Sequence, residues 1–413
     1  MFKKSKLLVI LLALALIPAT ASATATRVIG FGGEGAAFVI KDAANPVQFP
    51  STLVYYPHIL YAEFAQSATV AYWDSSVYKD ENGDTQTSYF LAKRTSTYLD
   101  RVGAWYGFGE GKCVLGFDVF HRNNTGYKGM PRIREDNIPF RLNVRWAKPF
   151  GNVAVGAALG LYHESYKEGK MTDGTSSSLE QKSTIIGLDL GLTALDNLLD
   201  AAVGFEMPSW TNTGADGKAI TENDGSMMIR AAARYWYHYG EKTTLIPNFE
   251  VRMLKDGYTA IDTSGISAST TTFRVGVGHN WKPADNVLVL FDFGVQFKST
   301  KYEWERTGTK EKTDSWTDLP YWRCGWEGQV FKWLKVRAGA EKIWQNVKQE
   351  TIPVEPEAGN TSTNMYFGGD FFVGPVVIQY LLDQDFVRRG PYFISGSEGS
   401  LFHRFSLFYK IPK

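Results

Sequence analysis

Apolar and polar residues alternate at every second position through much of this chain, and this pattern most narrows the folds it can adopt. Residues 140–146, FRLNVRW, place Phe, Leu, Val and Trp on one face and Arg, Asn and Arg on the other. Residues 287–298 and 404–411 repeat the pattern. A period of two is typical of β-strands with unlike faces, and no helical stripe of comparable length interrupts these segments. The sequence therefore predicts an all-β protein.

The connections between the alternating segments differ in length in a regular way. Short turns are expected near residues 150–152, 195–197, 240–242, 283–286 and 374–375. Longer polar loops are expected at residues 211–224, 256–270, 306–313 and 351–363. Short turns at one rim and long loops at the other are typical of a transmembrane antiparallel up-and-down β-barrel. We expect about 14–16 strands, because residues 89–109 do not divide clearly into hairpins.

Alternation alone does not decide which face of each strand is wet. A soluble sandwich turns its apolar face inward, whereas a membrane barrel turns it toward lipid. The aromatic share of 14% and the 40 glycines favour the membrane barrel. An exported soluble β-protein is the alternative that this pattern leaves open.

The first residues indicate export. Lys3, Lys4 and Lys6 precede the apolar run 7–17, and small residues that suit signal cleavage follow it. We expect a cleaved signal peptide at residues 1–23, a periplasmic or plug segment at 24–57 and an outer-membrane barrel at 58–413 of a bacterial cell. The two cysteines, Cys113 and Cys324, lie far from the apolar run, so no cysteine stands directly after that run to carry a lipid anchor.

Composition and motifs give little support for catalysis or nucleic-acid binding. The 44 basic and 43 acidic residues leave a formal net charge of +1, which does not favour nucleic acid. Residues 30–35 satisfy G-x-G-x-x-G, but no βαβ unit follows them. The six histidines lack a paired metal-ligand spacing, and no G-x-S-x-G motif occurs. We therefore expect no enzyme, no catalytic residues, no cofactor and no metal.

The inward face of the predicted strands carries charge of both signs. Two interpretations remain open: ion pairs that hold the wall and a plug in place, or a slightly cationic lining that favours anions. The arginines assigned to the barrel interior, called the lumen below, are Arg141, Arg145, Arg230, Arg234, Arg252, Arg274, Arg337 and Arg404.

Residues 42–53, DAANPVQFPSTL, cannot form a central strand. Pro46 and Pro50 each lack a backbone N–H and restrict the residue before them. The apolar content of residues 28–53 favours burial. We therefore expect a plug inside the lumen, with Asn45, Pro46, Phe49, Pro50 and Leu53 as its ligand or plug residues.

This N-terminal segment resembles that of the fatty-acid outer-membrane transporter family, and it is similar to the related barrel component of type IX secretion. The resemblance rests on residues 27–33, RVIGFGG, on Asp42, and on residues 49–53, FPSTL, which stand where the family carries N-P-A-x-L. It implies a monomeric barrel, usually of fourteen strands, whose plug lies on the route of hydrophobic compounds.

We therefore expect a porin-like or transporter-like outer-membrane barrel that passes or binds small hydrophobic molecules. The alternative is a non-transporting scaffold barrel of a secretion or surface-assembly system. The expected partners are outer-membrane lipid, a small hydrophobic solute and the barrel-assembly machinery, and the expected state is a monomer.

Overall fold

The computed structural model describes fourteen stretches of the chain. They are residues 25–67, 71–79, 85–93, 97–108, 113–124, 134–137, 140–168, 180–213, 219–223, 226–260, 263–304, 312–349, 358–382 and 402–411. The predicted signal peptide, residues 1–23, lies outside them.

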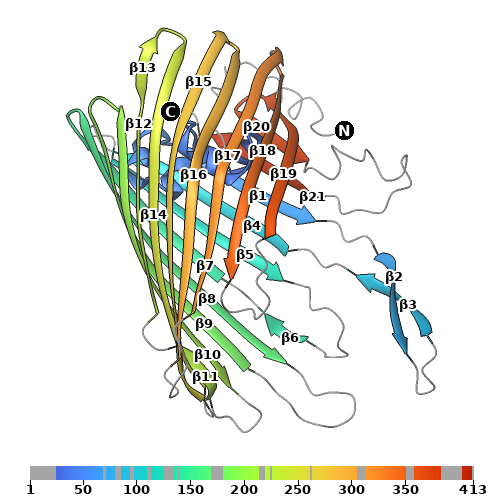
Figure 1. Cartoon of the computed structure of the whole chain (residues 1–413). Helices are drawn as coiled ribbons and strands as arrows, with labels where there is room; N and C mark the ends of the chain where they lie inside the picture. Colours follow the sequence, from blue (N-terminus) through green and yellow to red (C-terminus); the bar gives the residue numbers. More distant parts are fainter. Residues whose placement is uncertain are drawn as a thin grey trace, which may run out of the picture.

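Sixteen antiparallel strands form a closed up-and-down barrel (Figure 1). The barrel closes where β1 pairs with β21, from Ile59 opposite Lys410 to Ser67 opposite Phe402. The fold class is therefore the predicted one, with two strands more than the family resemblance implies. The strands are β1 (Ile59–Ser67), β4 (Thr97–Phe108), β5 (Cys113–Asn124), β7 (Phe140–Phe150), β8 (Val153–Glu168), β9 (Glu180–Ala194), β10 (Leu199–Thr213), β12 (Met227–Tyr235), β14 (Thr243–Ala260), β15 (Thr263–Ala284), β16 (Val287–Trp304), β17 (Lys312–Phe331), β18 (Leu334–Gln349), β19 (Ala358–Val373), β20 (Val376–Leu382) and β21 (Phe402–Lys410).

Five further strands explain why the strand count was hard to read from the sequence. β6 (Arg134–Asn137) pairs with β8 next to β7, while β11 (Ala219–Asn223) and β13 (Tyr237–Gly240) pair with β14 on either side of β12. β2 (Ala71–Lys79) and β3 (Thr85–Lys93) pair with each other in a separate two-stranded sheet. This hairpin projects from the barrel in Figure 1 and adds no strand to the wall.

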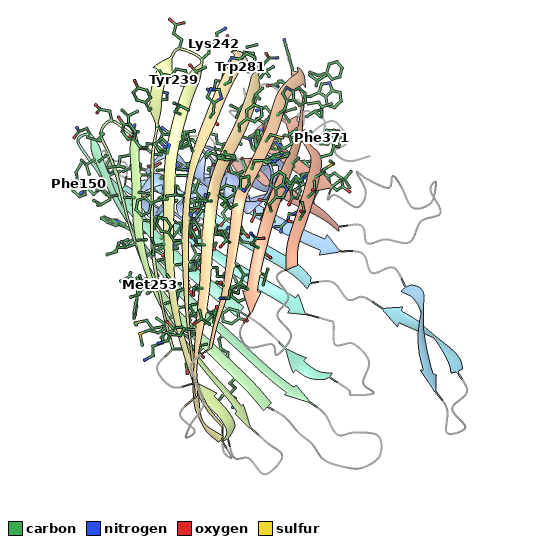
Figure 2. The ribbon with its side chains drawn as sticks, in the orientation of Figure 1. Phe150, Tyr239, Lys242, Met253, Trp281 and Phe371 are labelled. Carbon is green, nitrogen blue, oxygen red and sulfur yellow. The ribbon has the colours of Figure 1, made fainter. Side chains whose placement is uncertain are left out.

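The barrel wall is apolar outside and polar inside. On β16, Phe291 and Phe293 expose 53% and 57% of their surface, whereas Asp292 between them exposes 1%. Figure 2 shows Phe150, Trp281 and Phe371 near one rim and Met253 farther along the outer wall. A belt of exposed apolar side chains around a closed sheet is stable in lipid and would be costly in water. This reversed burial excludes the soluble sandwich and makes the chain a transmembrane-type barrel.

The described short turns lie at one rim, called the short-turn rim below. They join β7 to β8 at residues 151–152, β15 to β16 at 285–286 and β19 to β20 at 374–375. The predicted loop at residues 256–270 is wrong, because β14 and β15 are paired from Lys255 opposite Ser269 to Ala260 opposite Thr263. Strands of this length exceed the roughly 9–11 residues that cross a bilayer, so the sheet extends past the lipid at the long-loop rim.

Residues 25–56, called the plug below, lie inside the barrel near the short-turn rim (Figure 1). Four short helices make up the plug: α2 (Ala25–Gly30), η1 (Glu34–Phe38), η2 (Asn45–Val47) and η3 (Pro50–Tyr55). Gly32 and Gly33 have φ angles of 114° and 91°, a region that favours glycine, so they permit the turn between α2 and η1. None of the described helices is long and apolar enough to cross a membrane.

The two prolines of the opening motif start helices. Pro46 and Pro50 occupy the first turns of η2 and η3, where a backbone N–H has no partner to lose. Asp42 and Asn45 fix the preceding turn: the amide of Asp42 donates to Asn45 Oδ1 at 2.7 Å, and the amide of Ala44 donates to Asp42 Oδ1 at 2.9 Å. The segment is thus a compact turn followed by two short 3-10 helices.

Candidate functional site

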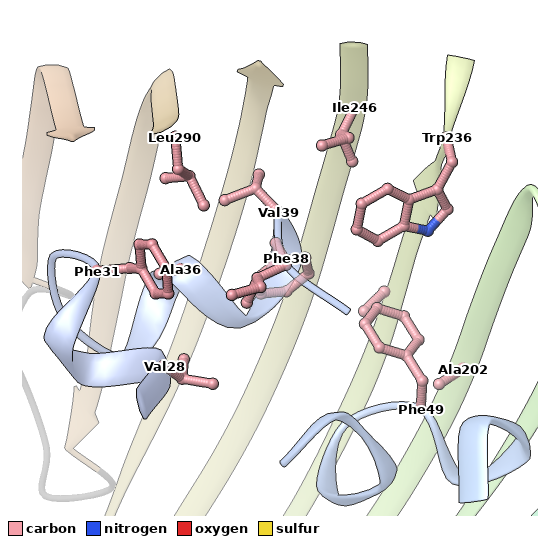
Figure 3. Packing of buried hydrophobic residues seen from close by; sticks show 12 residues of the cluster. Val28, Phe31, Ala36, Phe38, Val39, Phe49, Ala202, Trp236, Ile246 and Leu290 are labelled. Atoms are coloured by element: carbon pink, nitrogen blue, oxygen red, sulfur yellow. The ribbon is translucent and has the colours of Figure 1, made fainter. Parts of the chain in front are cut away.

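The five predicted plug residues are all buried within the barrel. Asn45, Pro46, Phe49, Pro50 and Leu53 lie in or next to η2 and η3. In Figure 3, Phe49 faces Trp236 and Ala202 of the wall. Val39 of the plug points toward Ile246 and Leu290, and Phe31 and Phe38 belong to the same apolar cluster. The plug is therefore packed as a small hydrophobic core inside a polar barrel.

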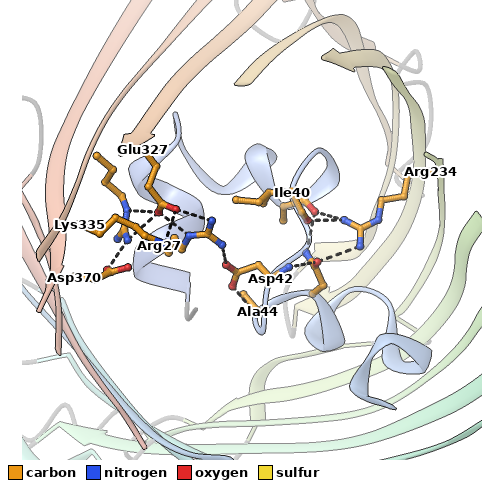
Figure 4. Close-up of polar contacts among 11 residues, drawn as sticks. Arg27, Ile40, Asp42, Ala44, Arg234, Glu327, Lys335 and Asp370 are labelled. Atoms are coloured by element: carbon orange, nitrogen blue, oxygen red, sulfur yellow. Dashed lines mark hydrogen bonds and ion pairs between the residues drawn. The ribbon is translucent and has the colours of Figure 1, made fainter. Parts of the chain in front are cut away.

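Arg234 on β12 is one of two charged anchors of the plug. Its Nε lies 2.8 Å from Asp200 Oδ2 on β10, within the wall. Its Nη1 donates to the carbonyl oxygens of Ala37 at 2.6 Å and Ile40 at 3.1 Å, and its Nη2 donates to Asn45 Oδ1 at 3.1 Å (Figure 4). One guanidinium thus connects both halves of the plug to two wall strands.

The Arg234 guanidinium also contacts the apolar part of the plug. Its central carbon lies 4.5 Å from the centre of the Phe49 ring, a favourable cation–π distance. Asp200, which pairs with Arg234, accepts a hydrogen bond from Thr193 at 2.8 Å, and Thr193 shares another with Ser51 of the plug at 2.8 Å. The anchor therefore extends from β12 through β10 and β9 to η3.

Arg27 forms the second anchor. Its Nε lies 2.7 Å from Glu327 Oε2 on β17, and its Nη1 lies 2.8 Å from Asp42 Oδ2 within the plug (Figure 4). Glu327 also pairs with Lys335 at 3.3 Å and Arg337 at 3.1 Å, both on β18. Separating one partner from a buried ion pair leaves the other charge uncompensated, which costs free energy. The network therefore opposes separation of α2 from β17 and β18.

Lys41 contacts the short-turn rim between the two anchors. Its Nζ donates to the carbonyl oxygen of Asn197 at 3.0 Å and lies 4.8 Å from the centre of a Trp236 ring. Burial lowers the pKa of the Lys41 ammonium from its ordinary value. The contact places one more plug cation against the turn between β9 and β10.

Glycines of the wall form a cradle for the plug backbone. A Cβ placed on Gly156 would lie 2.4 Å from the carbonyl carbon of Pro50, and one on Gly191 would lie 2.8 Å from the Ser51 nitrogen. On the other side of the lumen, a Cβ on Gly339 would lie 2.4 Å from the Gly30 carbonyl oxygen. Glycine within a strand often marks such close backbone approach.

The substitution Gly156→Ala is expected to loosen η3 from the wall. The added methyl group meets plug backbone, which cannot turn aside as a side chain can, and overpacking of this kind costs about 1–3 kcal/mol. Hydrogen exchange followed by mass spectrometry should show faster exchange in peptides that cover residues 50–55. The matched control is Gly187→Ala, whose Cβ would lie 3.1 Å from the flexible Glu206 side chain. Equal exchange in both variants would contradict the cradle.

The predicted lumen arginines divide into two groups. Arg234, Arg274 and Arg337 contact the plug: Arg274 lies over the Phe38 ring, and the Arg337 side chain packs against Gly30. Arg145, Arg230 and Arg252 instead pair with wall carboxylates, those of Asp118, Asp189 and Glu250. Arg404 is partly buried on β21, and the Arg141 side chain lies outside the described part of the structure.

Sequence reasoning missed several residues that hold or contact the plug, including Arg323, whose guanidinium packs against Gly35. Arg27, Arg323 and Glu327 were not assigned a role, although the alternation in residues 321–327 places Arg323 and Glu327 on the inward face. Glycine has no side chain, so the alternation of apolar and polar residues does not reveal which wall glycines face inward. Ser51 was assigned no role either, because its partner Thr193 is far away in the sequence.

Two cavities flank the plug. The outer cavity, of about 720 Å³, lies between the plug and the long-loop rim and is lined by Val28, Phe38 and Val47 of the plug and by β14, β15 and β16. The inner cavity, of about 390 Å³, opens toward the turns at residues 241–242 and 285–286. In the described part of the chain, no three His, Cys, Asp or Glu side chains are arranged to hold a metal ion.

Closed sheet, reversed burial and an internal plug together define the class of the protein as a plugged transmembrane β-barrel. No family model matches the chain, and no curated protein matches its sequence. Among solved structures it is similar to a Pseudomonas aeruginosa FadL homologue, with 11% identity over 96% of this chain and 100% of that one and a TM-score of 0.41.

Two other solved structures are similar at the same level. The CymD monoaromatic hydrocarbon channel has 11% identity over 96% of this chain and 99% of its own, with a TM-score of 0.38. The ferric yersiniabactin uptake receptor FyuA from Yersinia pestis has 11% identity over 79% of this chain, with a TM-score of 0.42, and this chain covers 54% of it. These proteins are outer-membrane barrels, as is the family that the N-terminal segment resembles.

Proposed function

We propose that the protein is a bacterial outer-membrane transport barrel that admits small molecules to a site above its plug. The observation that carries this proposal is the outer cavity of about 720 Å³, which is lined by wall strands and has the plug as its floor. Cavities that bind small molecules commonly measure about 300–1,000 Å³. A barrel of about 16 strands is wide enough for an aqueous channel, so the plug determines whether a path exists.

The floor of the outer cavity suits a molecule with an apolar part. Val28, Ile29, Phe38 and Val47 of the plug line it, together with Leu254 of the wall. Burial of apolar surface against these side chains contributes roughly 25 cal/mol per Å². The wall around this floor is polar, so the proposed solute is small and apolar for much of its surface without being a hydrocarbon throughout.

Passage through the barrel requires a rearrangement of the plug. The apolar cluster of Phe31, Phe38 and Phe49 lies between the outer and inner cavities, and Arg27 and Arg234 hold it to opposite walls. Binding in the outer cavity requires no such change. We therefore propose that a monomer in outer-membrane lipid binds the solute first and that plug movement connects the two cavities.

The strength of the plug anchors favours a second candidate function. A plug fixed by buried ion pairs on β12 and β17 also suits a closed scaffold barrel of a secretion or surface-assembly system. In that case the plug seals the membrane permanently, and partner proteins bind at the rims.

Permeation through reconstituted vesicles distinguishes the two candidates. Purified full-length protein is first checked for heat-modifiable gel mobility, which is expected of a membrane barrel. Proteoliposomes are then assayed for entry of small aromatic solutes, with protein-free vesicles as the control. We expect solute entry to rise with protein content and to saturate with solute concentration. Entry no faster than in protein-free vesicles would contradict transport and favour the scaffold.

A further inference from the structure

Three inward-facing glycines, called the glycine stripe below, lie on β15 and β16 between the outer and inner cavities. Gly276 and Gly278 are successive inward residues of β15, and Gly294 on β16 is the register partner of Gly276. Arg274, two residues before the stripe on β15, lines the outer cavity, and Asn280, two residues after it, lines the inner cavity. Because glycine has no side chain, the space beside the stripe is filled only by residues that reach over it from elsewhere.

Buried polar atoms without a protein partner lie beside the outer part of the stripe. Asp292 exposes 1% of its surface, and its Oδ1 has no hydrogen-bond partner among the described residues. A Cβ on Gly276 would lie 3.3 Å from this oxygen and would also meet the hydroxyl oxygen of Tyr321. The buried Nε of Arg274 has no described partner either. Buried polar groups that the protein leaves unpaired are normally satisfied by water, so we expect this part of the stripe to be hydrated from the outer cavity.

The inner end of the stripe is polar as well. Asn280 donates from Nδ2 to the carbonyl oxygen of Val39 at 2.8 Å, while its Oδ1 is buried without a partner in the described part of the chain. The same side chain lines the inner cavity, together with Lys282 two residues farther along β15. Water can therefore reach the inner end of the stripe from the short-turn rim.

The side chain of Val39, on the plug, separates these two polar ends. It is 0% exposed, and a Cβ placed on Gly278 would lie 2.7 Å from the Val39 Cβ. Ile246 on β14 is the register partner of Gly278, and Leu290 on β16 is the register partner of Asn280. Val39 points toward these two wall residues in Figure 3, and all three belong to one apolar cluster. At Gly278 the stripe is thus closed by apolar side chains.

The apolar barrier is thin along the plug backbone. Phe38 lines the outer cavity and Ile40 lines the inner cavity, whereas Val39 between them lines neither. The plug therefore passes from one cavity to the other within three residues. Only the middle one of these residues covers the glycine stripe.

We propose that the glycine stripe is a path for water and small inorganic ions that Val39 closes as a hydrophobic constriction. Apolar constrictions close channels by excluding water, without a backbone segment across the pore. This activity goes beyond the proposed function. The solute passes when the plug moves, whereas water and ions need only the Val39 side chain to give way. The path carries both Arg274 and Asp292, so it admits ions of either sign.

Planar-bilayer recording of the full-length Val39→Ser variant tests the path. Serine is smaller than valine and polar. We expect a steady conductance in potassium chloride about tenfold or more above that of the wild type, because a constriction without its apolar side chain no longer excludes water. N-methylglucamine and gluconate should carry far less current, because the plug still fills the rest of the lumen. Val47→Ser, which changes a plug valine of the outer cavity, is the matched control and should conduct like the wild type.

Trypsin cleavage after Lys41 reports whether the plug has moved. Steady conductance with wild-type cleavage supports the path. Wild-type conductance in Val39→Ser would overturn it, and so would equal conductance in Val47→Ser or equal current from the large ions. If Val39→Ser speeds cleavage, Val39→Thr decides, because threonine keeps the shape of valine: conductance above the wild type supports the path, and its absence overturns it. Solute entry into vesicles enters none of these outcomes, so the proposed function is tested separately.

Discussion

Deletion of residues 27–51 is expected to turn the protein into a continuously open pore. The deletion removes most of α2, all of η1 and η2 and the start of η3, and with them the plug side chains of the apolar cluster between the outer and inner cavities. The barrel itself closes through β1 and β21 without any plug residue in its ladder. A barrel of about 16 strands emptied of its plug leaves an aqueous channel.

Planar-bilayer recording measures this effect directly. Wild-type protein should show low or brief conductance, and the deletion variant should show a large, persistent conductance with little selectivity among small ions. Deletion of residues 71–93 is the matched control, because β2 and β3 pair with each other and with no strand of the wall. That variant should conduct like the wild type. Unchanged conductance after removal of residues 27–51, in a protein that still shows heat-modifiable mobility, would contradict the role of the plug as the barrier.

Replacement of Arg234 by glutamine is expected to release the plug from one wall. The change leaves Asp200 buried without its cation and removes the donor to the Ala37 and Ile40 carbonyl groups. Removing one partner of a buried ion pair costs about 3–5 kcal/mol. We expect much faster trypsin cleavage after Lys41, measured by mass spectrometry, and frequent channel openings in bilayer recordings.

Arg230→Gln is the matched control for this substitution. Arg230 lies four residues earlier on β12, faces the lumen and pairs with Asp189 at 2.8 Å, and its assigned contacts are with the wall rather than the plug. Its loss should change cleavage after Lys41 and conductance far less. If Arg230→Gln and Arg234→Gln behave alike, general disturbance of the lumen charge would explain the result, and the specific anchor would be wrong.

The sequence predicted the orientation of side chains well where apolar and polar residues alternate at every position of a strand. Alternation along residues 287–298 assigned Phe291 and Phe293 to one face and Asp292 to the other, and the structure places them so. The rule failed where the strands extend beyond the membrane: Asp, Gly, Ser and Thr fill most of residues 256–270, which were expected to be a loop, yet β14 and β15 extend into this range as far as Ala260 and Thr263. Their backbone pairing requires no apolar face once the sheet has left the lipid.

The candidate site was only partly predictable for a related reason. Pro46 and Pro50 excluded residues 42–53 from the ladder, and their apolar neighbours indicated burial. Nothing local distinguishes Arg234, which holds the plug, from Arg230, which pairs only with Asp189 among the described carboxylates. That difference depends on which inward-facing residue lies level with the plug along the barrel axis. This level is set by the tilt and register of the strands, and the alternation of apolar and polar residues does not reveal it.

By itself, the sequence determined the strand period, the inward or outward face of most strand residues and the exclusion of the proline segment from the sheet. All three follow from backbone geometry over a few neighbouring residues. Only the tertiary structure decided the closure at sixteen strands, the wall glycines that admit the plug and the ion pairs of Arg234 with Asp200 and of Arg27 with Glu327. These features depend on residues hundreds of positions apart meeting in one lumen, and a local pattern carries no information about such meetings.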